Sequence, residues 1–244
     1  MTEAKVLLVD DVPGERANFE RAFHNGLAVA PSIDRLNEHL RARLTWDIAF
    51  VDFNLSSPTS TGLTALLRLS QERPETRIVT YSQFTESGRT LYAAAARHWF
   101  GASALLDKTR NEPDMLIRYL RSLQQGINPT PVPWQRRLQW SHLIDSLLAD
   151  ASWVRIWRAL RECAGDMARV AQMLHVEPGS LRGFKDRATE AAIQFNERFH
   201  DIPHPGQTRN KKGILAAFAA EHRHFLMAPD LSTVMSPGTR RARC

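Results

Sequence analysis

The sequence predicts two domains: a doubly wound α/β domain with a five-stranded parallel sheet, followed by an all-helical domain. Three observations predict this. Apolar runs alternate with helical periodicity over residues 1–125, a proline-rich stretch follows at 126–133, and no strand pattern appears beyond it. A chain of 244 residues with 43% hydrophobic residues can bury the cores of two modest domains. We expect residues 134–227 to form the helical domain and residues 228–244 a flexible tail.

The expected strands are short apolar runs, which are typical of strands buried on both faces of a parallel sheet. They cover residues 6–9, 27–30, 48–51, 78–81 and 104–106. The segments that follow these runs place apolar residues at helical spacing. The expected helices are 15–25, 32–44, 62–72, 86–100 and 113–124. Such alternation predicts a functional site at the carboxyl ends of the strands.

The second half of the chain is expected to be helical throughout. Three prolines within residues 126–133 restrict the backbone and predict an extended, semi-rigid linker. Beyond the linker, Trp153 and Trp157 belong to an apolar pattern at helical spacing and are expected in the core. Four histidines of the C-terminal region are expected at the surface. They are His200, His204, His222 and His224.

The net charge of +6 lies entirely in the second half of the chain. Residues 1–125 contain 15 basic and 15 acidic residues, whereas residues 126–244 contain 17 basic and 11 acidic residues. This asymmetry favours a polyanionic partner for the second half. An ordinary solvated surface with a basic tail remains the alternative.

The sequence does not support several classes of protein. No stretch approaches the roughly 20 apolar residues of a membrane-spanning helix, so no membrane association is expected. No nucleophile–base arrangement, Walker loop or dinucleotide fingerprint is present, and we expect a protein that is not an enzyme. The two cysteines, Cys163 and Cys244, indicate no disulfide framework and fit the reducing cytoplasm. Cys163 is expected in the core.

Charged residues follow three of the expected strands. Asp10 and Asp11 close the first strand, Asp52 closes the third, and Lys108 follows the fifth. Carboxylates that meet at one sheet edge repel each other, and Mg²⁺ with its preference for oxygen ligands supplies the counter-charge. The same set suits phosphoryl transfer, because the cation neutralises charge as a carboxylate attacks phosphorus.

These residues resemble the receiver domain of response regulators, and the resemblance covers about the first half of the chain. It implies that Asp52 is the phosphorylated residue and that a histidine kinase is the partner that supplies the phosphoryl group. It also implies that Asn54 offers its backbone carbonyl to the metal, together with the acidic residues. Ser82 best matches the switch hydroxyl, with Thr80 as a less favoured register, and Lys108 matches the family's lysine.

Four features depart from the receiver family. Thr109 stands where the family usually has proline, Leu105 where an aromatic residue is common, and Gln83 where a small residue is usual. The loop at residues 56–61 is also long for the family. These departures leave open a receiver that is controlled only by contacts with other proteins.

Residues 165–188 resemble a helix-turn-helix, similar to that of Fis-type output domains. The first helix is expected from Met167 to Leu174, and the second begins at Pro178, which gives a unit at about 167–187. A shared core is expected from a set of apolar residues: Val170, Leu174, Val176, Leu181 and Phe184. The side chains then available to DNA are Arg169, Ser180, Arg182, Lys185 and Arg187.

Taken together, the resemblances imply a transcription regulator that dimerises and binds duplex DNA when phosphorylated. The alternative is an adaptor, switched by phosphorylation or contact, whose helical half docks a protein partner instead of DNA. Gly179 and Gly183 lie in the expected recognition helix, where each glycine costs up to ~1 kcal/mol of helix propensity. They keep the adaptor alternative open.

Overall fold

The computed structural model describes residues 4–83, 89–110, 112–200 and 210–236. The chain divides into two compact units. The described residues of unit 1 are 4–83, 96–110 and 112–135. Those of unit 2 are 89–95, 136–200 and 210–236. None of the described helices is long and apolar enough to cross a membrane.

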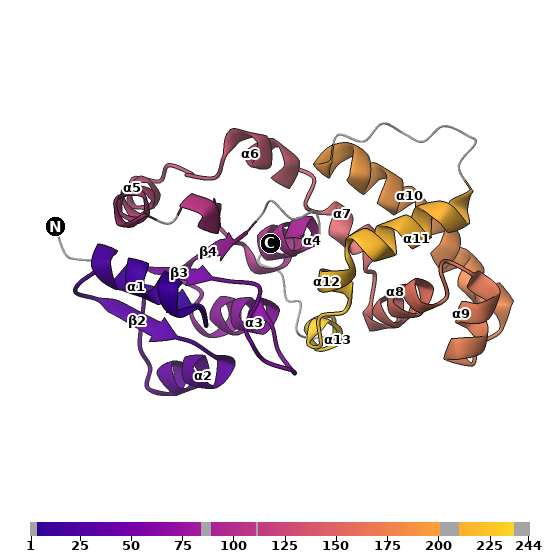
Figure 1. The fold of residues 1–244 in the computed structure, drawn as a ribbon, viewed down its shortest axis with the longest axis horizontal. Coiled ribbons are helices and arrows are strands. Elements are labelled where there is room, and N and C mark those ends of the chain that lie inside the picture. The colour runs from indigo at the N-terminus through magenta and orange to yellow at the C-terminus, as the bar shows by residue number, and fades with distance from the viewer. Residues whose placement is uncertain (1–3, 84–88, 111, 201–209, 237–244) are drawn as a thin grey trace. The chain divides into compact units, whose positions relative to one another are not determined.

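The first half of the chain alternates strand and helix (Figure 1). Its elements are β1 (Val6–Val9), α1 (Pro13–Ala22), β2 (Leu27–Ala30), α2 (Ile33–Arg41), β3 (Ile48–Val51), α3 (Gly62–Glu72), β4 (Arg77–Ser82), α4 (Thr90–Phe100), β5 (Ala104–Asp107), the 3-10 turn η2 (Lys108–Arg110) and α5 (Pro113–Gln124). All five expected strands are confirmed, and each expected helix is present. Helices α3 and α5 have the expected bounds, whereas the ends of α1, α2 and α4 are shifted. Residues 86–88 of the fourth expected helix lie outside the described residues.

The five strands form one parallel sheet in the order β2-β1-β3-β4-β5. Helix α1 packs beside α5, and α2 beside α3 (Figure 1). Rings of Phe19, Phe50 and Tyr81 meet edge-to-face in the core beneath α1 and α5, with centroids 5.0 to 6.2 Å apart. Because helices cover the sheet, strand residues on both faces are buried, which explains the uninterrupted apolar runs.

Helix α3 begins against the end of β3. The hydroxyl of Thr61 accepts a hydrogen bond from the Leu63 amide (3.2 Å), and the Gly62 amide donates to the Phe53 carbonyl (2.8 Å). A Cβ atom at position 62 would lie 1.9 Å from the backbone oxygen of Asp52. Glycine is therefore required here by a close backbone approach.

The proline-rich stretch differs from the extended linker that the sequence predicts. The side chain of Thr130 is buried, and its Oγ1 accepts a hydrogen bond from the amide of Leu105 in β5 (2.8 Å). Helix α6 (Val132–Leu138) begins before the stretch ends, since Pro133 suits the first turn of a helix. Part of this segment thus belongs to the sheet domain.

The rest of the chain is helical, as expected. Its elements are α7 (Leu143–Leu147), α8 (Ala151–Glu162), α9 (Met167–Leu174), the 3-10 turn η3 (Pro178–Leu181), α10 (Arg182–Phe199), α11 (Lys211–Glu221), α12 (Arg223–Leu226) and α13 (Leu231–Val234). Trp153 and Trp157 are buried against Phe184, with ring centroids 4.8 and 5.3 Å away, and Cys163 is also buried. These core predictions are confirmed.

Three further expectations for the second half are wrong. Residues 228–236 of the expected flexible tail are packed: Ala228, Leu231 and Val234 are buried, and Arg158 donates to the Ala228 carbonyl (2.7 Å). His222 is fully buried, because the chain bends there between α11 and α12 and carries the ring inward. Val176 is 41% exposed instead of joining the helix-turn-helix core. Residues 237–244 and His204 lie outside the described residues.

Candidate functional site

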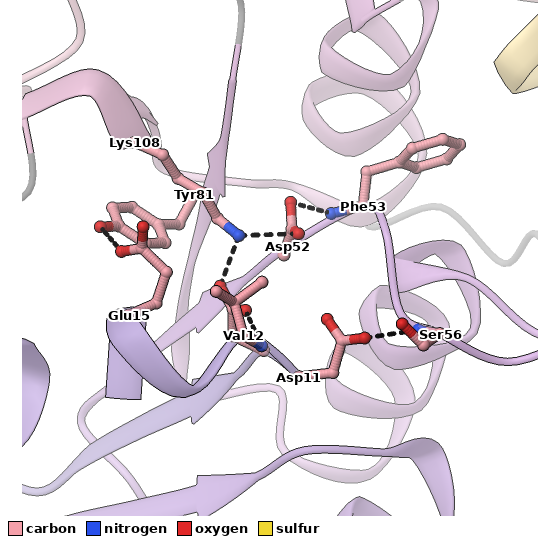
Figure 2. Close-up of polar contacts among 9 residues, drawn as sticks. Asp11, Val12, Glu15, Asp52, Phe53, Ser56, Tyr81 and Lys108 are labelled. Atoms are coloured by element: carbon pink, nitrogen blue, oxygen red, sulfur yellow. Dashed lines mark hydrogen bonds and ion pairs between the residues drawn. The ribbon is translucent and has the colours of Figure 1, made fainter. Parts of the chain in front are cut away.

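The carboxyl edge of the sheet brings together three charged side chains that the sequence singles out (Figure 2). Asp10 follows β1, Asp52 follows β3, and Lys108 follows β5. The Nζ atom of Lys108 lies 2.6 Å from Asp10 Oδ2 and 2.7 Å from Asp52 Oδ2. All three residues are buried. The order β1-β3-β4-β5 places these strand ends side by side, so the topology itself assembles the site.

Backbone amides hold the carboxylates in place. Asp10 Oδ1 accepts a hydrogen bond from the amide of Val12 (2.9 Å), and Asp52 Oδ1 accepts one from the amide of Phe53 (2.7 Å). Figure 2 shows Asp11 turned toward Ser56, whose amide donates to Asp11 Oδ2 (2.8 Å). Asp11 therefore ties the loop after β3 to the end of β1.

Burial and charge act against each other in this cluster. Burial raises the pKa of Asp10 to about 6, although the ammonium group of Lys108 opposes the rise. Burial alone would lower the pKa of Lys108, but the charges of Asp52 and Asp10 outweigh it and raise that pKa above its usual value. Lys108 thus stays protonated as a buried counter-ion.

The donor set fits a hard divalent cation. Three carboxylates gather at this edge, all with oxygen donors, and a single ammonium group lies between two of them. Lys108 therefore neutralises only part of the negative charge. Oxygen ligands with an excess of negative charge are what Mg²⁺ prefers.

The remaining predicted residues take different places. Ser82 ends β4 fully buried, in register with Asp107 of β5. The hydroxyl of Thr80 donates to the carbonyl of Ala104 within the sheet (3.4 Å), which supports Ser82 as the better match for the switch position. Asn54 lies in the loop after β3 with an exposed side chain.

Sequence reasoning missed a second polar pair at this edge, formed by Tyr81 and Glu15. The hydroxyl of Tyr81 donates to Glu15 Oε2 (2.6 Å), and Lys108 Nζ lies 5.5 Å from the centre of the Tyr81 ring (Figure 2). The available signal was an acidic residue in the first turn of α1, near the end of a strand that carries a tyrosine. The Tyr81 ring therefore lies beside the ammonium group of Lys108.

In unit 2, the chain forms the expected helix-turn-helix. Asp166 caps α9 by accepting hydrogen bonds from the amides of Ala168 (3.0 Å) and Arg169 (3.3 Å). His175 ends α9 in the left-handed conformation, at φ 54° and ψ 45°, where glycine is more usual. Ala171, in the middle of α9, is buried.

The second helix differs in its first turn. The sequence predicts a helix from Pro178, whereas the structure has the 3-10 turn η3 before α10 begins at Arg182. The hydroxyl of Ser180 is used within this turn, donating to the Glu177 carbonyl (2.7 Å). The second helical segment thus begins at Pro178 as expected, but its first turn is 3-10 and not α-helical, a form that is frequent at the N-termini of α-helices.

The side chains expected to reach DNA differ in their exposure to solvent and in their contacts with other side chains. Arg169, Ser180 and Arg182 are exposed, and Lys185 is half-buried. Arg187 is exposed but lies over the ring of Trp153, with its guanidinium carbon 5.0 Å from the ring centre. The carboxylate of Asp186 lies on the same helix and pairs with Lys211 (2.8 Å).

No protein-family model matches the sequence, and no curated protein matches it either. Solved structures of similar fold do exist. RcsB from Salmonella enterica serovar Typhimurium, bound to a promoter with the phosphomimetic BeF3−, aligns at 14% identity and a TM-score of 0.53. This alignment covers 90% of the present chain and 100% of RcsB.

Two further complexes agree with this alignment. A structure of two RcsB dimers on two parallel DNAs aligns at 13% identity with a TM-score of 0.52. A complex of the two-component response regulator RcsB with DNA aligns at 16% identity with a TM-score of 0.51. Both alignments cover 90% of this chain and 99% of the other. The chain therefore has the fold of full-length RcsB: a five-stranded parallel α/β domain followed by a helical domain.

Proposed function

We propose that this chain is a two-component response regulator, phosphorylated on Asp52 by a histidine kinase, whose helical half binds duplex DNA. The buried cluster of Asp10, Asp52 and Lys108 carries the first part of this proposal, because it unites a nucleophilic carboxylate with a fixed cation. Residues 1–125 act as the receiver and residues 134–227 as the output domain, with 126–133 between them. Two cysteines and the regulatory role fit the cytoplasm.

The chemistry follows from the positions of the side chains. A carboxylate oxygen of Asp52 attacks phosphorus, the bond from phosphorus to the donor's imidazole nitrogen breaks, and an acyl phosphate forms. Lys108 already touches Asp52 Oδ2 and donates to a phosphoryl oxygen after transfer. Ser82, at the end of the neighbouring strand, supplies a hydroxyl to a second phosphoryl oxygen.

Mg²⁺ is the cofactor that fits this site. Asp10, Asp11 and Asp52, with the backbone carbonyl of Asn54, would hold it. When bound, it neutralises the charge that builds up on the transferring phosphoryl group.

The proposal for DNA rests on unit 2. Its helix-turn-helix presents exposed basic residues, and the whole positive excess of the chain lies in residues 126–244. The RcsB structures of the same fold are DNA complexes, one of them with dimers, and we therefore propose that this chain binds DNA as a homodimer. A relation to Fis-type domains remains a prediction.

A protein-docking adaptor is the second candidate. Asp186 favours it, because a carboxylate on the expected recognition helix repels DNA phosphates. Its pKa is lowered by the hydrogen bond and charge of Lys211 and by the charges of Arg182 and Lys185, so it remains ionised among these basic groups. A mixed-charge helix of this kind also suits a protein surface.

The phosphorylation proposal is tested by labelling with a small phosphodonor. Wild type should acquire an acid-labile phosphoryl group only with Mg²⁺ present, and Asp52→Asn should acquire none. Asp47→Asn is the matched control: Asp47 precedes the same strand, at the opposite edge of the sheet, and is exposed. Undiminished labelling of Asp52→Asn would remove the acceptor assignment, and Mg²⁺-independent labelling would remove the metal.

The DNA proposal is tested by electrophoretic mobility against random duplex at several salt concentrations. Contacts with phosphates release counter-ions, so the logarithm of the affinity should fall linearly with the logarithm of salt. Failure to shift duplex at low salt would favour the protein-docking adaptor.

A further inference from the structure

A cluster of two histidines and a glutamate lies where two long helices of unit 2 end. His200 is the C-cap residue of α10, Glu221 is the last residue of α11, and His222 is the C-cap residue of α11. His200 Nε2 lies 3.8 Å from Glu221 Oε1. Each of the three residues offers one ligand atom, and these atoms all lie within 4.8 Å of one another.

His222 is the unusual member of the cluster. Its ring is fully buried, packed against Phe218 at 4.3 Å and Phe195 at 5.7 Å between centroids. Neither ring nitrogen has a hydrogen-bond partner among the described residues. Buried polar groups are nearly always paired, so two orphaned nitrogens on one ring require an explanation.

The protonation state of His222 agrees with a ligand role. Burial and, to a smaller extent, the neighbouring charge of His200 together lower the pKa of His222 to about 3. The imidazole is therefore neutral at physiological pH and keeps a lone pair for a metal. Neutral histidine is the form that binds transition metals.

The surrounding backbone also favours a cation. α10 has 18 residues and α11 has 11, and both end at this cluster. The carbonyl end of a helix carries a partial negative charge, so two such ends attract positive charge to the same place. His200 and Glu221 are partly exposed, with side-chain exposures of 14% and 28%, which gives an ion access from solvent.

We propose that His200, Glu221 and His222 form a binding site for a divalent transition-metal ion, of which Zn²⁺ fits best. Two imidazole nitrogens and one carboxylate oxygen are a common ligand set for Zn²⁺, with water completing the coordination. Nitrogen donors disfavour Mg²⁺, so this site differs in selectivity from the acidic edge of the sheet. The hydroxyl of Thr90, also in unit 2, lies 3.3 Å from His200 Nε2 and is a further polar group beside the cluster.

The bound ion would join the end of α10 to the end of α11. α10 carries the second half of the helix-turn-helix, so the metal would fix the helix that the proposed function assigns to DNA. The metal site itself does not depend on that function, because its ligands include neither the phosphorylated residue nor the basic side chains.

The test is calorimetric titration of the full chain with Zn²⁺, with Mg²⁺ in excess to occupy the acidic site. Wild type should bind one Zn²⁺ per chain and melt at a higher temperature when loaded. Co²⁺ in place of Zn²⁺ should give the visible absorption of a site with nitrogen and oxygen ligands. His200→Gln, Glu221→Gln and His222→Phe should each weaken Zn²⁺ binding more than about tenfold. Loss of a residue that only hydrogen-bonds to a metal ligand already lowers metal affinity by about that factor, and loss of a ligand should lower it more.

Two controls make the result specific. His224→Gln removes an exposed histidine two residues from His222 and should leave binding unchanged. Asp52→Asn should also leave it unchanged, which separates this site from the acidic one. Phenylalanine preserves the aromatic packing at position 222. Should His222→Phe nevertheless fail to fold, the variants of the partly exposed His200 and Glu221 test the proposal. Unchanged Zn²⁺ binding in both of these variants would overturn it. An equal loss of Zn²⁺ binding in His224→Gln would also overturn it.

Discussion

The same kind of ion pair occurs in both units, in opposite surroundings. Lys108 lies 2.7 Å from Asp52 with side-chain exposures of 7% and 6%, whereas Lys211 lies 2.8 Å from Asp186 with exposures of 53% and 50%. Water screens the second pair, and its two side chains lose freedom when they pair. The first pair is shielded from solvent, and loss of either partner leaves a buried charge uncompensated. The distance between the charged atoms alone therefore does not determine how much an ion pair contributes to the stability of the fold.

Replacing each lysine tests this difference most strongly. Lys108→Met should destabilise unit 1 by about 3–5 kcal/mol, because Asp10 and Asp52 lose their shared counter-ion in the interior. Lys211→Met should leave the unfolding midpoint unchanged within error. Urea unfolding followed by circular dichroism measures both, and added Mg²⁺ should restore part of the loss in Lys108→Met. Equal effects of the two substitutions would contradict the comparison.

Gly62→Ala should be the next largest effect. A Cβ atom there would meet the backbone oxygen of Asp52, which must move, at a cost of about 3 kcal/mol. Phosphoryl labelling of Asp52 should fall as well, since its backbone shifts. The matched control is Gly14→Ala in the first turn of α1, where an added Cβ meets nothing within 4 Å. That change should stay within about 0.5 kcal/mol of wild type. Full labelling of a stable Gly62→Ala protein would contradict the expectation.

In unit 2, substitutions of Arg182 and Lys185 should have different effects on DNA binding: the first should change sequence specificity, and the second should change the affinity for any sequence. Arg182→Ala should relax sequence preference by about 1–3 kcal/mol, because arginine can bond a guanine edge with two hydrogen bonds. Lys185→Ala should weaken all sequences alike and flatten the salt dependence. Mobility shifts with specific and random duplex measure this, after thermal melts show that the variants are folded. Arg155→Ala, an exposed arginine of α8, controls for net charge. Wild-type binding by both variants would mean that α10 does not read DNA.

The smallest effect concerns the segment between the domains. Thr130→Val should cost about 1 kcal/mol, because the amide of Leu105 loses its hydrogen-bond partner in a buried place. Thr45→Val, at an exposed position of the same unit, is the control and should be neutral. Thermal melts of both variants provide the measurement. No change in Thr130→Val would indicate that residues 126–133 behave as a detached linker.

The sheet and its acidic edge could be predicted because local pattern determines them. Uninterrupted apolar runs identify buried parallel strands, and the residues that follow these runs must meet at one edge. The meeting of Asp10, Asp52 and Lys108 at this edge could therefore be predicted without knowledge of the tertiary packing. The bounds of α9 were predicted equally well from the resemblance to a helix-turn-helix, and Asp166 caps the helix at its start.

Features that depend on tertiary packing could not be predicted. The burial of His222 results from the bend between α11 and α12, and no sequence pattern marks a histidine that turns inward. Thr130 sits among prolines that indicate a linker, yet its hydroxyl meets a strand 25 residues earlier in the chain. Residues 231–234 read as a frayed end because the segment is too short to show periodicity.

The loop after Asp52 is fastened at both ends. The Ser56 amide binds Asp11 near its beginning, and the Gly62 amide binds the Phe53 carbonyl at its end. The residues between these anchors can vary in number without moving the acceptor, and each doubling of a loop's length costs only about 0.6 kcal/mol. The length of this loop can therefore change without changing the position of Asp52. A regulator that recognised its kinase through residues 57–61 could exchange one signalling partner for another while its phosphorylation chemistry stayed the same.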